Sequence, residues 1–157
     1  MSKICCFTGN REIIGISPAE SAKKLESVLI DLIENQGYTI FRAGGAIGFD
    51  TIAALCVLKL REKYPQIKLH IYIPCKNQDK YFTAAEKKLY KLIIKRADET
   101  FLLQENYSNA AMHTRNRAMV DGSDICVALM TKLTGGTYST VRYARQKHVP
   151  VVDLVKI

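Results

Sequence analysis

The chain has 157 residues, of which 48% are hydrophobic, and its 23 lysines and arginines against 15 acidic residues give a formal net charge of +8. This length suits one compact domain whose core needs neither disulfides nor a metal, so we expect a single domain over residues 1–157. No run approaches the roughly 18 apolar residues that a membrane span needs. Because Met1-Ser2-Lys3 leads into an apolar segment rather than a signal peptide, we expect a cytoplasmic protein without a membrane partner.

The cysteines are interpreted as packing residues. They form no CxxC pair, and most lie in apolar runs, where a thiol behaves as a small hydrophobic group. We therefore expect reduced, buried thiols. Cys75, which follows Pro74 at the end of an expected strand, has a second interpretation as a reactive thiol near the site. The five are Cys5, Cys6, Cys56, Cys75 and Cys126.

The positive charge raises the local concentration of anionic ligands and permits non-specific binding to nucleic acid. The lysines are scattered, mostly on polar faces of the expected helices, which is typical of a solvated surface. The charge therefore agrees with a phosphate-bearing ligand but does not identify one.

The first part of the chain reads as a strand followed by a helix. Residues 4–8 form an apolar run before a glycine, as a buried strand does before a turn. Ser17 supplies a helix N-cap, Pro18 the first helical position and Glu20 the glutamate of a capping box. Apolar residues then recur at helical spacing until Gly37, where we expect the helix to end. They are Ala22, Leu25, Leu29, Leu32 and Ile33.

The alternation of strands and helices continues through the chain. An amphipathic helix is expected to end before Pro65, and Thr83 and Glu86 form a second capping box. Residues 67–73 alternate apolar and polar side chains, which favours a strand nearer the sheet edge. The order predicts an α/β, Rossmann-like, doubly wound three-layer sandwich with a mostly parallel sheet of about six strands. Further strands are expected at 38–41, 99–103, 125–130 and 149–155, and further helices at 108–120 and 138–147.

Three glycine-containing turns follow strands of this sheet. In an open α/β sheet, ligands bind outside the carboxyl ends of the strands, where helix N-termini present unpaired backbone N–H groups. Glycine lets a phosphate approach the backbone, and neighbouring hydroxyls add donors. A tight turn without a ligand is the alternative interpretation of Gly44, Gly45 and Gly48, but the second turn, at Gly135 and Gly136, favours a ligand site. The predicted turn residues are Thr8, Gly9, Gly44, Gly45, Gly48, Gly135 and Gly136.

Four residues near these turns each have two interpretations. Thr137 and Thr140 open the fifth helix, where either helix capping or phosphate contact explains a hydroxyl. Arg11 follows a strand-ending glycine by two residues, which favours a phosphate clamp over a surface position. Asp50 either caps its helix or accepts a hydrogen bond from a ribose hydroxyl.

One arginine of the helix over residues 108–120 is expected to face inward. Helical spacing places Met112, Arg115 and Met119 near one face, and His113 on another. An inward guanidinium needs an anionic partner, which is either a bound phosphate or an internal carboxylate. Because the histidines are dispersed, no metal site is indicated, and no cofactor is expected apart from a nucleotide ligand.

Five segments occur in a recognisable order. They are Cys6-Phe7-Thr8-Gly9-x-Arg11, Gly44-Gly45-x-x-Gly48-x-Asp50, Pro74-Cys75-x-x-Gln78, Arg115-Asn116-x-x-Met119-Val120-Asp121 and Gly135-Gly136-Thr137. Together they resemble the YpsA-like proteins of the SLOG superfamily over nearly the whole chain. Two departures are Asn10, where the family pattern has a histidine, and Tyr81-Phe82 near an expected tryptophan.

The resemblance implies a Rossmann-like protein that binds nucleotides or nucleotide-derived signals, with roles in bacterial stress, division or phage conflict, and a homodimer or higher homo-oligomer. The wider superfamily includes LOG-type phosphoribohydrolases of cytokinin nucleotides, DprA-type binders of single-stranded DNA, and sensors of cyclic ADP-ribose-like signals. In the LOG pattern an arginine and a later glutamate carry catalysis. Arg115 matches that arginine, but the glutamate position is Arg142, which cannot act as a carboxylate, and Thr134 and Tyr138 also depart from the pattern.

The leading hypothesis is a sensor or stress-regulatory protein that binds a phosphorylated nucleotide ligand such as ADP-ribose or NAD. The alternative is a nucleotide N-glycoside hydrolase, in which Arg115 orients the phosphate and Asp50 substitutes for the missing carboxylate. A second alternative is single-stranded nucleic-acid binding, which agrees with the charge of +8. Against it, the sequence shows no strand face that combines aromatic and basic side chains for base stacking.

Overall fold

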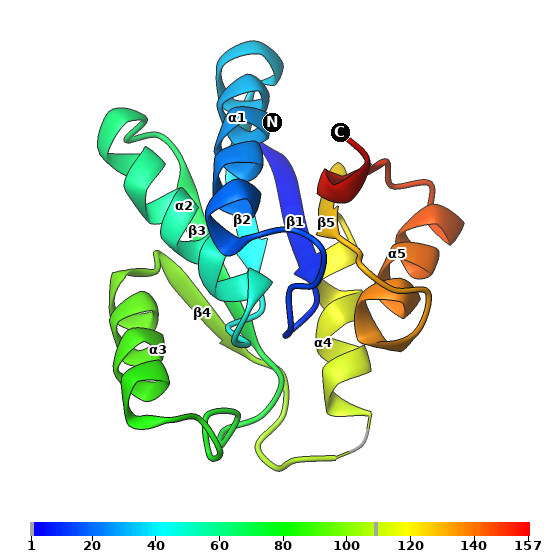
Figure 1. The fold of residues 1–157 in the computed structure, drawn as a ribbon. Helices are drawn as coiled ribbons and strands as arrows, with labels where there is room; N and C mark the ends of the chain where they lie inside the picture. The colour runs from blue at the N-terminus through cyan, green and yellow to red at the C-terminus, as the bar shows by residue number, and fades with distance from the viewer. Residues whose placement is uncertain (1, 109) are drawn as a thin grey trace.

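The computed structural model describes residues 2–108 and 110–157. It contains a six-stranded sheet in the order β4-β3-β2-β1-β5-β6, in which every strand pair is parallel (Figure 1). The elements are β1 (Lys3–Gly9), α1 (Pro18–Gln36), β2 (Tyr38–Ala43), α2 (Phe49–Lys63), β3 (Lys68–Ile73), α3 (Ala84–Arg96), β4 (Glu99–Leu102), α4 (Ala111–Val120), β5 (Ile125–Leu129), α5 (Gly135–Gln146), β6 (Val151–Asp153) and the short 3₁₀ helix η1 (Leu154–Lys156).

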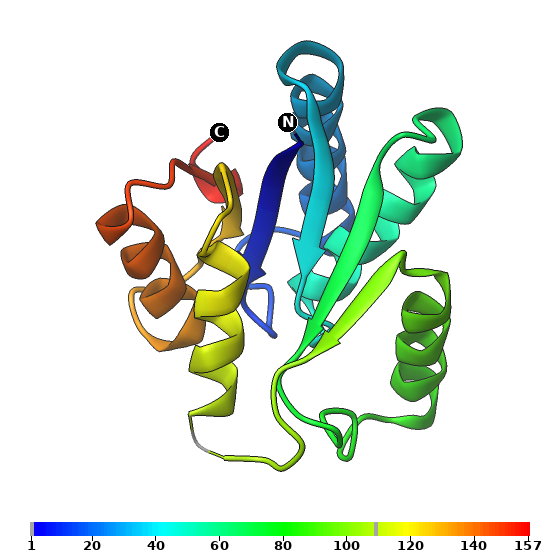
Figure 2. The same ribbon diagram turned by 180° about the vertical axis from the view of Figure 1, so that it is seen from behind.

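Helices cover both faces of the sheet. α1, α2 and α3 lie on one face, and α4 and α5 lie on the other, as a comparison of Figures 1 and 2 shows. The chain builds the sheet outward from β1 to β4 and then returns to place β5 on the other side of β1. This confirms the predicted Rossmann-like three-layer fold. The return brings the carboxyl ends of β1 and β5 side by side, which is where such sheets bind ligands.

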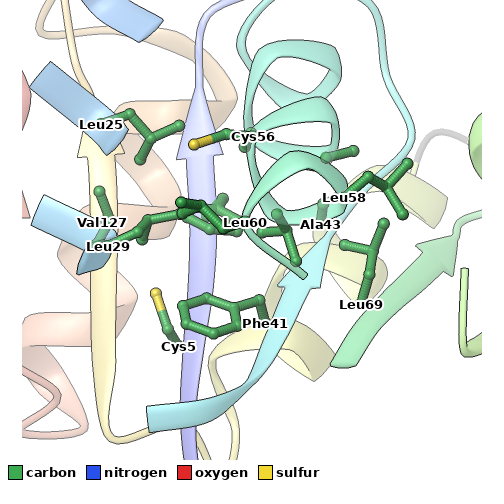
Figure 3. Packing of buried hydrophobic residues seen from close by; sticks show 14 of the residues in the cluster. Cys5, Leu25, Leu29, Phe41, Ala43, Cys56, Leu58, Leu60, Leu69 and Val127 are labelled. Carbon is green, nitrogen blue, oxygen red and sulfur yellow. The ribbon is translucent and has the colours of Figure 1, made fainter. Parts of the chain in front are cut away.

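The larger core lies between the sheet and the layer of α1, α2 and α3 (Figure 3). Because alternate side chains of a strand point to opposite faces, Phe7 of β1 and Phe41 of β2 reach the same core, where their rings stack with centroids 6.1 Å apart. Phe49, the first residue of α2, meets Phe7 edge-on at 6.4 Å. This packing fixes the start of α2 against the carboxyl end of β1.

Several helix ends follow their sequence signals. Ser17 caps α1 by accepting a hydrogen bond from the Glu20 N–H at 3.0 Å, and Gly37 ends that helix with a φ of 75°. Thr83 and Glu86 form the expected capping box of α3. These predictions are confirmed.

Several element boundaries differ from the sequence expectation, and three of them have a local cause. α5 begins earlier, at Gly135, because its two glycines enter the first helical turn instead of forming a separate loop. α4 begins later, at Ala111, and residue 109 of the expected helix lies outside the described residues. β6 ends at Asp153, whose carboxylate accepts a hydrogen bond from the Val155 N–H at 3.1 Å and starts η1.

One side of β3 and β4 is covered only in part among the described residues, where α4 packs against Tyr72 of β3 (Figure 2). His70 and Tyr72 of β3 pack there against Phe101 of β4, which is 38% exposed. The Arg42 guanidinium of β2 lies 5.3 Å from the centroid of the Tyr72 ring. No single strand shows this combination in the sequence, because the residues come from three separate strands; base stacking on this face stays a prediction. We call these four residues the aromatic face.

Candidate functional site

A cleft of about 620 Å³ opens where the glycine-containing loops after β1 and β2 and the start of α5 converge beside α4. Most of the predicted site residues line it. These are Thr8, Gly9, Arg11, Asp50, Arg115, Gly135, Gly136 and Thr137. The other four, Gly44, Gly45, Gly48 and Thr140, do not line the cleft.

Arg115 of α4 is buried, as its helical position predicted, with 3% of its surface exposed. Its Nη1 donates to the Gly44 carbonyl and, at 3.3 Å, to the Tyr72 carbonyl, while Nε donates to Asn116 Oδ1 at 2.7 Å. Nη2 has no hydrogen-bond partner among the described residues. Burial lowers the pKa of Arg115, and nearby Asp50 opposes this shift. The side chain is thus oriented by neutral acceptors on the wall of the cleft.

Asp50 lies in the first turn of α2, and its surface is 7% exposed. Its Oδ2 accepts a hydrogen bond from the Ala46 N–H at 3.3 Å, so the carboxylate holds the loop before the helix, while Gly48 occupies the N-cap position. Burial raises the pKa of Asp50, and the charge of Arg115 opposes this shift. None of the ion pairs among the described residues joins these two side chains.

The glycines after β2 shape the loop. A Cβ at Gly44 would collide with the side chains of Arg115 and Asp50, so its absence provides the space that these charged groups occupy. Gly48 has a φ of 88°, and a Cβ there would collide with the backbone of Arg11. Gly44 and Gly48 do not line the cleft, but the space left by their missing side chains lets Arg115, Asp50 and Arg11 take their places in its wall.

Asn10 connects the loops of the site. Its Oδ1 accepts hydrogen bonds from the Thr131 N–H at 3.1 Å and the Thr131 hydroxyl at 2.8 Å, in the segment after β5. Its carbonyl accepts from the Phe49 N–H at 3.3 Å, at the start of α2. Asn10 lines the cleft and is 7% exposed. The residue that replaces the family's histidine thus ties three elements together.

The amino terminus of α5 faces the cleft. Gly135, Gly136 and Thr137 line it, and the N-cap residue Thr134 makes no side-chain capping bond. The first N–H groups of a helix have no partner within the helix, so this end is suited to bind an anion. The Thr140 hydroxyl donates to the Gly136 carbonyl at 2.7 Å, which is a bond within the helix.

Sequence reasoning missed several residues of the cleft. Lys132 lines the cleft. It could have been predicted from its position shortly after β5, which is similar to the position of Arg11 after β1. His113, expected on another face, also lines the cleft, because the cleft extends along the exposed first turn of α4. The described lining residues include three cationic side chains and one carboxylate. The cations are Arg11, Lys132 and Arg115, and the carboxylate is that of Asp50. This balance favours an anionic ligand.

Among the described residues, no group of three or more His, Cys, Asp or Glu side chains is placed to hold a metal ion, and no helix is long and apolar enough to span a membrane. All five cysteines are free and buried, and Cys75 does not line the cleft. Arg142, at the position of the LOG glutamate, is exposed and lies over the Tyr138 ring, away from the lining residues.

Comparison with protein families identifies the group. The model of the YspA SLOG family, YpsA, matches residues 19–151. The chain belongs to this SLOG family. The uncharacterized SPbeta prophage-derived protein YoqJ of Bacillus subtilis is 34% identical over 138 residues, which cover 80% of this chain and 81% of YoqJ. A UPF0398 protein of Halalkalibacterium halodurans is 28% identical over 133 residues, which cover 82% of this chain and 70% of that protein.

A solved structure shares the SLOG fold. DNA processing protein A from Helicobacter pylori, whose structure was determined for its single-stranded DNA binding mode, superposes with a TM-score of 0.67 and 20% sequence identity. The likeness covers 98% of this chain and 70% of that protein. At this identity the comparison shows a common fold.

Proposed function

We propose that this SLOG protein binds the phosphate of a nucleotide or nucleotide-derived ligand, of the ADP-ribose or NAD type, in the cleft, and that it acts as a sensor or regulator. The observation that carries the proposal is the buried guanidinium of Arg115, which lines the cleft and makes no ion pair among the described residues. A buried cation is costly without a compensating anion. Asp50 compensates only in part, since burial raises its own pKa. A phosphate would complete the balance.

The start of α5 supports the same ligand chemistry. The free N–H groups at the start of α5 add partial positive charge, and Lys132 and Arg11 add two exposed cations at the rim. Charge-assisted hydrogen bonds from an arginine and from backbone N–H groups are the usual means of holding a phosphate. The cleft therefore offers donors from α4 and α5, two helices that pack against each other.

Thermal unfolding with AMP, ADP, ATP, NAD, ADP-ribose and cyclic ADP-ribose tests the proposal. A ligand at 100 times its Kd stabilises the native state by about 2.7 kcal/mol, which raises the Tm of a domain of this size by several degrees. We expect such a shift with at least one of the six compounds. No shift with any of them, at millimolar concentration, would contradict the proposal.

The alternative function is hydrolysis of the N-glycosidic bond of a nucleotide bound in the same cleft. The observation that favours it is the buried carboxyl of Asp50 on the wall of the cleft, with a raised pKa, as a general acid requires. Chromatography of each ligand mixture after incubation checks for free base. Base release that is lost in Asp50→Asn would establish a hydrolase, whereas intact ligand after long incubation with bound protein would exclude it.

Single-stranded nucleic-acid binding is the second candidate. The aromatic face favours it, because base stacking on aromatic side chains with adjacent cations is a common mode of binding single strands. Binding of a labelled oligothymidylate should then weaken steeply with salt and fall roughly 5- to 150-fold in Tyr72→Ala, from the loss of about 1–3 kcal/mol of stacking. Tyr81→Ala, at an 88% exposed tyrosine, is the matched control. Equal losses in both variants would remove this candidate.

A further inference from the structure

A second cavity lies beside the cleft. It has a volume of about 370 Å³ and is enclosed by the loop between β1 and α1, the first half of α2, and α3. Arg11, Ile47 and Asp50 line both cavities, so the two share a wall. We call this second cavity the annex.

The annex differs from the cleft in its chemistry. Its walls are formed largely by aliphatic and aromatic side chains, among them Ile13, Ile52, Phe82, Leu89 and Ile94. Each of these five is half-buried, so apolar surface remains accessible at this site. An apolar cavity of this size falls in the range of about 300–1,000 Å³ that small-molecule sites occupy. The annex thus suits an apolar ring better than a phosphate.

One polar group of the annex is available to a ligand. The Tyr90 hydroxyl accepts a hydrogen bond from Gln78 Nε2 at 3.4 Å, and its own proton has no acceptor among the described residues. Burial raises the pKa of Tyr90 to about 12, so the phenol keeps that proton at neutral pH. Gln78 Oε1 is buried and has no hydrogen-bond partner in the described part of the chain. Gly45 leaves room for this pair, because a Cβ there would lie 3.0 Å from Gln78 Nε2.

We propose that the annex binds the flat heteroaromatic ring of the ligand whose phosphate occupies the cleft. In this arrangement the Tyr90 hydroxyl donates to a ring nitrogen or carbonyl. Asp50, on the shared wall, faces the sugar that joins ring and phosphate. The assignment rests on the proposed function and adds where the base lies and what recognises it.

Calorimetric titration with ribose 5-phosphate and with the four nucleoside 5′-monophosphates separates the two cavities, because ribose 5-phosphate has no base. The wild type should bind ribose 5-phosphate measurably, and at least one nucleotide about 10-fold more tightly. Leu89→Trp fills the annex and should reduce that preference to within about 2-fold, with ribose 5-phosphate affinity unchanged. Leu92→Trp is the matched control, because Leu92 lies on the same helix, is 45% exposed and does not line the annex.

Tyr90→Phe gives a second measurement that leaves the annex open. Loss of one neutral hydrogen bond should reduce the preference for the nucleotide by roughly 3- to 10-fold, again without effect on ribose 5-phosphate. Equal binding of all five compounds by the wild type, or an unchanged preference in both Leu89→Trp and Tyr90→Phe, would overturn the annex assignment and leave the phosphate site standing. Absence of binding by all five would also overturn the annex assignment, and the thermal shifts with the six nucleotides then decide separately whether the phosphate site stands.

Discussion

Gly48 shows how a single backbone position maintains the site. It has a φ of 88° and a ψ of −129°, and an added Cβ would collide with the backbone of Arg11. Gly48→Ala should therefore lower the free energy of unfolding by about 1–3 kcal/mol, measured by urea denaturation. In Gly136→Ala the new Cβ meets only Asn116 Nδ2, at 3.8 Å, and stability should change by less than about 0.5 kcal/mol. Similar losses in both variants would contradict this role of Gly48.

His70 should make the stability of the protein depend on pH. Burial lowers the pKa of His70 below its usual 6.5, and the carboxylate of Glu99, 3.4 Å away, opposes the shift. The fold thus favours the neutral imidazole. Its stabilisation is complete above pH 6.5 and is lost as the pH falls through 6.5 toward the folded pKa. Urea denaturation at pH 7.5 and 5.5 should show a smaller difference in His70→Gln than in the wild type, and an equal difference would refute this.

Residues that follow a strand could be predicted from sequence because the strand end itself places them. Thr8 near the end of β1 and Arg11 just after it were found in this way, and both line the cleft. The role of Asn10 could not be predicted, because its partner Thr131 is distant in sequence. The annex was missed for the same reason, since Tyr90 and the loop at Gly45 meet only in the folded chain.

Helix termini differ in how much their caps contribute. Ser17 makes a side-chain bond to the backbone of α1, so Ser17→Ala should lower the free energy of unfolding by about 1 kcal/mol. Thr134 makes no such bond at the start of α5, so Thr134→Ala should cost less than about 0.5 kcal/mol. Chemical denaturation measures both values. A cost of Thr134→Ala equal to that of Ser17→Ala would show that the start of α5 is capped, not open to a ligand.

The difference between the caps of α1 and α5 also explains which helix bounds could be predicted from sequence. α1 has an N-cap, a proline and a left-handed glycine at its end, all local signals, and its bounds were found. α5 begins with Gly135 and Gly136, which resemble a loop in sequence but form the first turn of the helix in the folded chain. Its start was therefore missed. β6 was predicted too long, because Asp153 turns the chain into η1 through a side-chain bond.

At the scale of the whole molecule, the fold separates two surfaces that differ in composition. The cleft lies at the carboxyl ends of the strands, and the aromatic face lies on the partly covered side of β3 and β4. The alternation of strands and helices predicted a mostly parallel sheet with helices on both faces. The partly covered side could not be predicted, because it depends on how far α4 and α5 extend across the sheet. The homodimer implied by the family resemblance remains a prediction, which sedimentation velocity checks.

Arg115 gives the most direct measurement of whether the cleft binds phosphate. Calorimetric titration with AMP and ADP-ribose compares the wild type, Arg115→Ala and Arg142→Ala, with thermal melts confirming that each variant is folded. Loss of a charged hydrogen bond of about 1.5–3 kcal/mol should weaken binding by roughly 10- to 150-fold in Arg115→Ala. Arg142→Ala removes an exposed arginine outside the cleft and should bind as the wild type does. Undiminished binding by folded Arg115→Ala, or an equal loss in Arg142→Ala, would contradict the phosphate site.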